Sequence, residues 1–169
     1  YPHLEVLPVR CNVGTRLRKL DEGQFDALVM ASAGLKRLGL GDRIRQIIPA
    51  EVSLPAPGQG ALGIEIRNGD EKMEAALGFI NSPETRACCM AERAVSRALG
   101  GSCQVPLAAY AVVENGELWL RALVGNHKEG KAAFTQARGP LAEPEALAAR
   151  VVEDLRRQGA EDYLKACLG

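Results

Sequence analysis

One cysteine lies where regular structure is expected to stop. In ALGGSCQVP, residues 98–106, Cys103 follows two glycines and a serine, between a predicted helix and a predicted strand. Structural cysteines usually pack inside regular elements as small apolar residues. The position therefore leaves three roles open: a buried turn residue, a redox thiol, or a nucleophile that becomes a covalent attachment point. The negative end of the helix dipole does not favour a thiolate, so a lowered thiol pKa needs cations from elsewhere.

A second stretch carries arginines at an expected helix start. In RCNVGTRLRK, residues 10–19, Arg10 and Arg16 stand on either side of a glycine-containing loop that leads into a predicted helix. Backbone N–H groups at a helix N-terminus attract anions, and arginine adds forked, charge-assisted hydrogen bonds to carboxylate or phosphate. Residues 1–50 also carry more Lys and Arg than Asp and Glu. The pattern predicts either an anion site or a solvated basic surface.

The third stretch is GQGALG, residues 58–63, which matches G-x-G-x-x-G. In dinucleotide-binding proteins that motif follows a strand and opens a helix. Here Pro55 and Pro57 precede it and the strand-like IEIR follows it. These glycines therefore favour a hinge or a close backbone approach over nucleotide binding.

Composition excludes several classes of function. The 169 residues include 21 Lys and Arg and 21 Asp and Glu, so the formal net charge is +0 and no global basic surface points to nucleic acid or membrane. No apolar run reaches the roughly 20 residues that span a bilayer. The five cysteines are irregularly spaced and form no metal-ligand cluster with the two histidines. An odd number of cysteines favours free thiols in a reducing compartment, the cytoplasm.

The elements that must position these residues fall into two sets. The first half alternates predicted strands with helices, which is typical of an α/β sheet. The expected strands cover 4–9, 25–31 and 61–67, and the expected helices cover 12–23, 33–48 in two short turns, and 70–80.

The second half predicts a self-contained α+β unit. A helix begins after the N-cap Ser82 and stops at two glycines, residues 100–101. A β-hairpin follows, with Asn115 and Gly116 as its type I′ turn. The remaining elements are a third strand over 132–138 and helices over 143–159 and about 160–168.

Three long stretches together resemble one known family. RCNVGTRLRKLDEGQFDALVMASAGLKRLGL, LPAPGQGALGIEIR and AERAVSRALGGSCQVPLAAYA are similar, in order and spacing, to the porphobilinogen deaminases, also called hydroxymethylbilane synthases. The resemblance covers essentially the whole chain. It implies a cytoplasmic, monomeric transferase that deaminates four porphobilinogen molecules and joins them head to tail into hydroxymethylbilane, in tetrapyrrole and haem biosynthesis.

The resemblance also implies the fold class, α/β plus α+β. Residues 1–57 would be the later half of the second domain of a periplasmic-binding-protein-like α/β pair, and residues 58–80 would cross back to complete the first. Residues 81–169 would form a small α+β domain with a three-stranded antiparallel sheet, helices and the cofactor-attachment loop. The chain would then be a C-terminal part of the enzyme, because it starts at Tyr1-Pro2 inside a domain.

Site residues follow from the same resemblance. Cys103 would hold the dipyrromethane cofactor through a thioether, and Arg16 and Gln59 would contact that cofactor. Arg10, Arg16 and Arg37 would bind the acetate and propionate groups of the substrate.

The resemblance places the catalytic aspartate upstream of residue 1, so no catalytic residue and no metal site is expected here. The implied partners are porphobilinogen and the missing N-terminal part, without nucleic acid or membrane. The family has glycine where this chain has Cys11, which would cost on the order of 1 kcal/mol if the backbone there needs a positive φ. Two alternatives remain: a non-catalytic carboxylate- or anion-binding module, and a thiol redox protein that uses Cys103.

Overall fold

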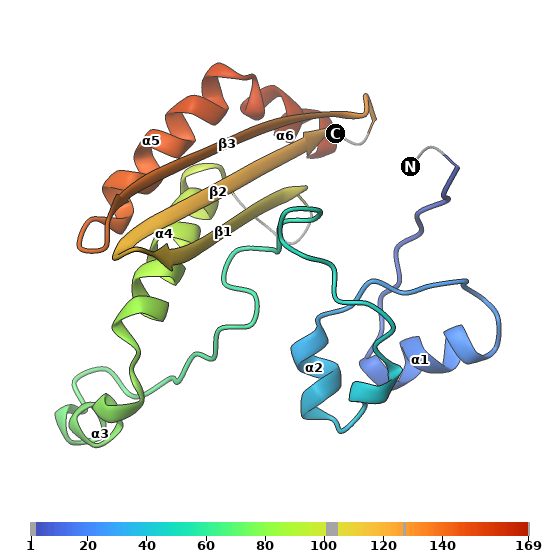
Figure 1. The fold of residues 1–169 in the computed structure, drawn as a ribbon, viewed down its shortest axis with the longest axis horizontal. Helices are drawn as coiled ribbons and strands as arrows, with labels where there is room; N and C mark the ends of the chain where they lie inside the picture. Colours follow the sequence, from blue (N-terminus) through green and yellow to red (C-terminus); the bar gives the residue numbers. More distant parts are fainter. Residues whose placement is uncertain (1–2, 101–104, 127, 169) are drawn as a thin grey trace. The chain divides into compact units, whose positions relative to one another are not determined.

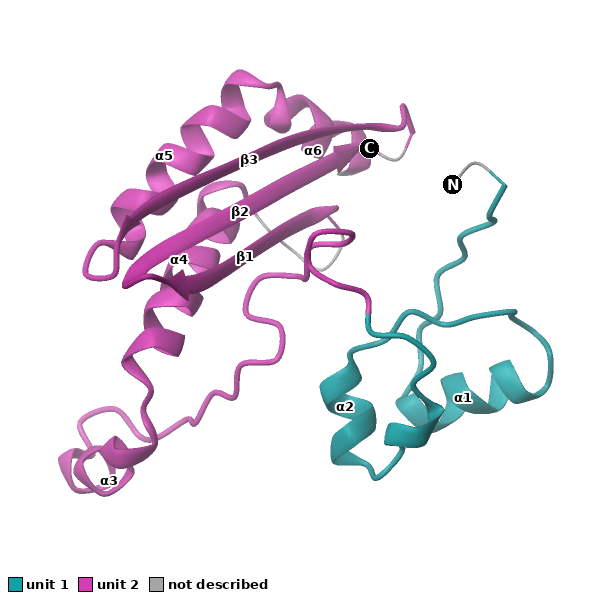
Figure 2. Ribbon diagram, in the orientation of Figure 1, with its two compact units in different colours: residues 1–47 teal, residues 48–169 magenta. Residues whose placement is uncertain are grey.

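The chain forms two compact units, residues 1–47 and residues 48–169 (Figure 2). The structure is a computed structural model, and it describes residues 3–100, 105–126 and 128–168.

Short helices build the first unit. Helix α1 spans Val13–Asp21, helix α2 spans Ser32–Arg37, and a 3-10 turn, η1, spans Gly41–Arg43. The side chain of Asn12 caps α1 by accepting a hydrogen bond of 2.8 Å from the backbone N–H of Thr15. Leu17 of α1 and Leu35 of α2 are the buried apolar residues of the unit. The helix predicted over 12–23 is confirmed as α1. Of the two helical turns predicted over 33–48, the first is confirmed as α2, whereas the second is wrong: the 3-10 turn ends at Arg43, and residues 44–48 are not helical.

The predictions of strands over 4–9, 25–31 and 61–67 were wrong for this structure. These segments contain no strand, and Val6, Val29 and Leu62 are each more than four-fifths exposed. A strand is stable only when a neighbour satisfies its N–H and C=O groups, and no described residue pairs with any of the three segments. The described residues therefore do not form the predicted α/β sheet.

The second unit starts with a long irregular stretch and two helices. Helix α3 spans Glu71–Leu77, a 3-10 turn, η2, spans Gly78–Ile80, and helix α4 spans Pro83–Ala98. Ser82 caps α4, because its hydroxyl accepts a hydrogen bond from the N–H of Thr85 at 3.2 Å. Proline at the first helical position needs no N–H partner there. The predicted start of this helix is confirmed.

A three-stranded antiparallel sheet follows in the order β1-β2-β3 (Figure 1). Its strands are β1 Leu107–Glu114, β2 Glu117–Asn126 and β3 Lys131–Pro140. The β1–β2 turn has positive φ at both central residues, 53° at Asn115 and 79° at Gly116, as a type I′ hairpin requires. Helices α5, Pro144–Arg157, and α6, Ala160–Leu168, complete the unit. The predicted α+β architecture of this half is confirmed.

The two faces of the sheet have different surroundings. Along β2, every second residue is fully buried against the helices: Leu118, Leu120, Ala122 and Val124. The helices contribute Val95 from α4, Leu147, Val151 and Leu155 from α5, and Ala160 and Leu164 from α6. The helices lie on one side of the sheet (Figure 1), and because side chains alternate along a strand, the intervening residues of β2 belong to the other face. On that face Arg121 lies over the rings of Trp119 and Tyr110, at 4.1 Å and 5.1 Å from the ring centroids. The helices thus cover one face only.

Candidate functional site

The first candidate site is the N-terminus of α1. Arg16 lies in the first turn of this helix, and its Nε donates a hydrogen bond of 2.8 Å to the backbone carbonyl of Cys11. This contact holds the guanidinium at the backbone of the residue that follows Arg10. Within the described part of the chain, neither arginine has an acidic partner, whereas Arg18 of the same helix is paired with Glu22 at 3.7 Å. The outward N–H groups of Arg16 therefore keep their capacity for an added carboxylate or phosphate.

Cys11 does not strain this loop. Asn115 is the non-glycine residue with positive φ among the residues that the structure describes, so Cys11 lies in an ordinary backbone region. The expectation of a backbone cost for cysteine in place of glycine therefore does not hold in this structure. The carbonyl of Cys11 instead serves as the acceptor that orients Arg16.

Arg37 ends helix α2 in the same unit as Arg10 and Arg16. Its side chain is exposed and forms no ion pair with the described residues. In contrast, Arg43 of the following turn pairs with Asp21 of α1 and connects the two helical segments. Arg37 is thus open to an anionic ligand, but no interaction brings it to the Arg10–Arg16 loop.

Gln59 lies at the tip of a glycine turn in the second unit. Gly58 and Gly60 have φ of 72° and 88°, a conformation that other residues rarely adopt. The backbone N–H of Gln59 donates to the carbonyl of Ala56 at 3.0 Å, and its side-chain Oε1 accepts from the N–H of Ala56 at 3.3 Å. The exposed Gln59 side chain therefore lies on a turn, and no helix follows the G-x-G-x-x-G motif.

A buried carboxylate, which the sequence reasoning missed, holds this turn. Glu92 of α4 is only 5 % exposed, and its two oxygens accept hydrogen bonds from Gly58 N–H at 2.6 Å and Ala111 N–H at 2.7 Å. Burial raises the pKa of Glu92, while the two backbone N–H groups act in the opposite direction. A signal was present in the sequence: Glu92 lies one turn after Cys88 and beside the apolar stripe of Ala91 and Val95.

Cys103 lies outside the described residues. The nearest described elements on either side of it in sequence are α4, which ends at Ala98, and β1, which begins at Leu107. Three other cysteines, Cys11, Cys88 and Cys89, are free thiols among the described residues. Burial raises the pKa of Cys88 to about 11, with a further contribution from the nearby Glu92 carboxylate, which favours the protonated thiol at neutral pH.

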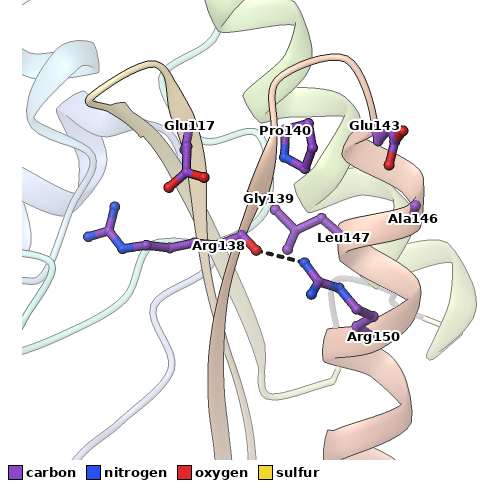
Figure 3. Close-up of a pocket in the computed structure, with 8 residues that line it drawn as sticks. All are labelled: Glu117, Arg138, Gly139, Pro140, Glu143, Ala146, Leu147 and Arg150. Carbon is purple, nitrogen blue, oxygen red and sulfur yellow. Dashed lines mark hydrogen bonds between the residues drawn. The ribbon is translucent and has the colours of Figure 1, made fainter.

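A pocket at one end of the sheet involves none of the predicted site residues (Figure 3). It lies between β3 and α5, where Nη2 of Arg150 donates a 2.6 Å hydrogen bond to the carbonyl of Arg138. A Cβ at position 139 would lie 3.0 Å from that nitrogen, so a larger residue there would require the guanidinium to shift slightly. The contact fastens α5 to β3 and has a structural role.

Other classes of site are not found in the described part of the chain. No group of three or more His, Cys, Asp or Glu side chains there is placed to hold a metal ion. No helix among those described has both the length and the apolarity for a membrane span.

Fold and site together define a class: an α+β domain whose sheet has helices on one face only, together with a second, helical unit that carries arginines without described acidic partners at a helix start. Residues 1–75 match the family profile described as porphobilinogen deaminase, dipyromethane cofactor binding domain, and residues 86–157 match the profile of the porphobilinogen deaminase C-terminal domain. The chain belongs to the porphobilinogen deaminase family.

Two curated relatives agree with this assignment. The chain is 53% identical to the porphobilinogen deaminase of Thiobacillus denitrificans over 166 residues, which is 98% of the chain and 54% of that protein. It is 50% identical to the porphobilinogen deaminase of Chromobacterium violaceum over 169 residues, 99% of the chain and 54% of that protein. The chain thus spans about half the length of the curated relatives it matches.

Proposed function

We propose that this chain is the C-terminal part of a transferase that deaminates four porphobilinogen molecules and joins them into hydroxymethylbilane on a covalently bound dipyrromethane. The observation that carries the proposal is the Arg16 guanidinium, turned over the start of α1 and without an acidic partner among the described residues, within the segment that matches the cofactor-binding profile. The match of both family profiles supports the same activity.

The substrate's charge explains why the site needs arginines. Each pyrrole unit carries an acetate and a propionate, so every added unit brings two negative charges into the site. We assign Arg10, Arg16 and Arg37 to the binding of these carboxylates, with Arg16 also contacting the cofactor. Forked N–H groups suit planar carboxylates, and the N-terminus of α1 adds a favourable dipole. These contacts set affinity and position, whereas proton transfer needs a separate acid.

The described residues fit a cofactor that carries carboxylate groups. Arg16 retains unpaired guanidinium N–H groups, and Gln59 is exposed on a fixed turn, so both can donate hydrogen bonds to it. We assign covalent attachment to the thiol of Cys103, because sulfur is the soft nucleophile that this linkage requires. When bound, the dipyrromethane supplies a free pyrrole α-carbon as the primer for chain growth.

The catalytic aspartate belongs, in this proposal, to an upstream N-terminal part of the protein. Residues 1–57 complete the second domain of a periplasmic-binding-like pair, residues 58–80 cross to the first, and residues 81–169 form the attachment domain. The 169 residues alone would then show no turnover. We propose that the complete enzyme is a monomer that needs neither nucleic acid nor membrane. We also propose a cytoplasmic location, which the free thiols of Cys11, Cys88 and Cys89 support.

Intact-mass measurement on the complete protein tests the attachment. In the protein without substitutions we expect a mass increase of two pyrrole units. Cys103→Ser should abolish this mass increase, whereas the matched control Cys89→Ser should retain it. An unadducted Cys103 in active protein would refute the attachment. Porphobilinogen binding without adduct or product would instead support the alternative, a non-catalytic anion-binding module.

Arginine substitutions test the substrate contacts. Arg16→Leu should lower kcat/KM by at least about tenfold, since charge-assisted hydrogen bonds contribute about 1.5–3 kcal/mol. Arg18→Leu, on the same helix, should have little effect because Arg18 is paired with Glu22 and exposed. Equal kinetics in the two variants would remove Arg16 from the site.

A further inference from the structure

Glu92 makes an unusual set of contacts for a helical carboxylate. Both of its oxygens accept hydrogen bonds from backbone N–H groups of other segments, Gly58 and Ala111, and the side chain is almost completely buried. Burying a carboxylate is costly, and the cost is offset only when its oxygens are satisfied. One buried acid therefore connects three segments: helix α4, strand β1 and the glycine turn.

The contact to Ala111 gives the carboxylate a fixed orientation. Ala111 lies in the middle of the edge strand β1, where it pairs with Leu120 of β2, so the sheet holds its backbone in place while its N–H donates to Glu92. With Oε1 held there at 2.7 Å, Oε2 is directed at Gly58 N–H at 2.6 Å. The turn is thereby attached to the rigid body of the α+β domain.

The contact to Gly58 fixes the residue that follows it. The carbonyl of Gly58 accepts from Ala61 N–H at 3.2 Å, which closes the turn around Gln59. Glycine has many accessible backbone conformations, so Gly58 and Gly60 do not by themselves fix the turn. The hydrogen bond from Gly58 to Glu92 restrains it to one conformation. A second contact holds the start of the same stretch: Glu51 pairs with Arg121 of β2 at 2.9 Å.

We propose that Glu92 is a positioning residue for Gln59, because its carboxylate holds the Gly58 amide and so sets where the Gln59 side chain is presented. This inference rests on the proposed function, in which Gln59 contacts cofactor or substrate. It adds that the attachment domain itself orients this side chain, through α4, which ends at Ala98. Glu92 touches no reacting group in this arrangement.

The first measurement uses the 169-residue chain and requires no activity. Glu92→Gln keeps the side-chain shape but has one carbonyl oxygen, and its NH2 group cannot accept from an N–H. We expect amide hydrogen exchange at Gly58 or Ala111 to rise at least about tenfold, with no change in Glu84→Gln, an exposed acid on the same helix. Unchanged exchange at both amides would overturn the anchoring.

The second measurement is a kinetic double-mutant cycle in the complete, cofactor-loaded enzyme. If Glu92 acts through Gln59, Glu92→Gln should lower kcat/KM about tenfold in the parent but less than about twofold when Gln59→Ala is already present. A purely structural role would give the same fall in both backgrounds, and that result would overturn the proposal. If Glu92→Gln does not fold, judged by circular dichroism, Glu92→Asp enters the same cycle, since the shorter side chain cannot span both amides.

Failure of this inference is distinguishable from failure of the proposed function. An active parent enzyme with additive effects would leave the function intact and remove only the positioning role. A parent that binds no dipyrromethane and forms no product would refute the function, whereas the exchange measurement would still decide whether Glu92 anchors the turn.

Discussion

Replacing Arg121 by lysine tests what holds the buried guanidinium on the open sheet face. The Arg121 side chain is only 6% exposed, although it carries a full charge. Its guanidinium lies 4.1 Å from the ring centroid of Trp119, and Nη1 donates a 2.9 Å hydrogen bond to Glu51. Nε is buried without a hydrogen-bond partner in the described chain. Stacking on the rings and the ion pair therefore raise the free energy of unfolding, whereas the unpaired nitrogen lowers it.

The magnitudes favour stacking as the dominant contribution. A desolvated cation–π contact contributes about 2 kcal/mol, and the more distant ring of Tyr110 adds about 1 kcal/mol. The unpaired Nε costs roughly 1 kcal/mol or more, and lysine removes that cost along with the planar stack. The expected loss of unfolding free energy for Arg121→Lys is thus about 2 kcal/mol, equivalent to a Tm lower by roughly 10 °C for a unit of this size.

Arg138→Lys is the matched control. Arg138 also lies over Trp119, at 4.7 Å, but its side chain is 43% exposed. Water screens an exposed cation, so we expect Arg138→Lys to lower the free energy of unfolding by less than about 1 kcal/mol. Because Trp119 is the single tryptophan of the chain, its fluorescence during urea unfolding reports on this face alone. If Arg121→Lys lowered the free energy of unfolding by no more than Arg138→Lys does, the claim that burial strengthens the stacking would be refuted.

Three further predictions concern packing, acidity and reactivity. Leu155→Ala, at a fully buried site, should cost about 3 kcal/mol in urea unfolding, whereas the same change at the exposed Leu62 should cost less than about 0.5 kcal/mol; similar losses would contradict this core. The hydrogen bond from Arg121 lowers the pKa of Glu51 below its ordinary value of 4.5. The stability that Glu51→Gln removes should therefore be present above pH 4.5 and disappear as pH falls through the lowered pKa; a difference that persists in acid would contradict it. Because the pKa of Cys88 is raised to about 11, iodoacetamide at pH 8 should label it on the order of a hundredfold more slowly in the folded chain than in urea; equal rates would refute its burial.

Local signals predicted the α+β half well. Ser82 followed by proline marks a helix start, and Asn115-Gly116 marks a hairpin, because each needs only neighbours in sequence to act. Alternation along β2 then separates the helix-covered face from the open face. The strands expected in the first half failed for the opposite reason, since a strand depends on a partner that can lie anywhere in a chain.

The candidate site shows the same difference between local signals and contacts with residues far away in sequence. The Arg10–Arg16 loop was predicted from a helix start and its charges, and the structure adds the hydrogen bond from Arg16 to Cys11. Glu92 was missed because its two partners are 34 and 19 residues away. A helical glutamate is usually exposed, so only its place beside an apolar stripe distinguishes it.

The failed strand predictions also bear on the proposed upstream half. The run FDALVMA, residues 25–31, has the apolar content of a strand covered on both faces, yet Val29 is 84% exposed. Exposing such a run costs apolar burial and leaves backbone groups without partners in the protein, so the segment gains most when a neighbouring strand pairs with it. Under the proposed function that strand belongs to the N-terminal part. Addition of that part should therefore slow amide exchange across residues 25–31 while leaving β2 unchanged. Unchanged exchange in residues 25–31 of the active complete enzyme would show that the run is not a strand at all.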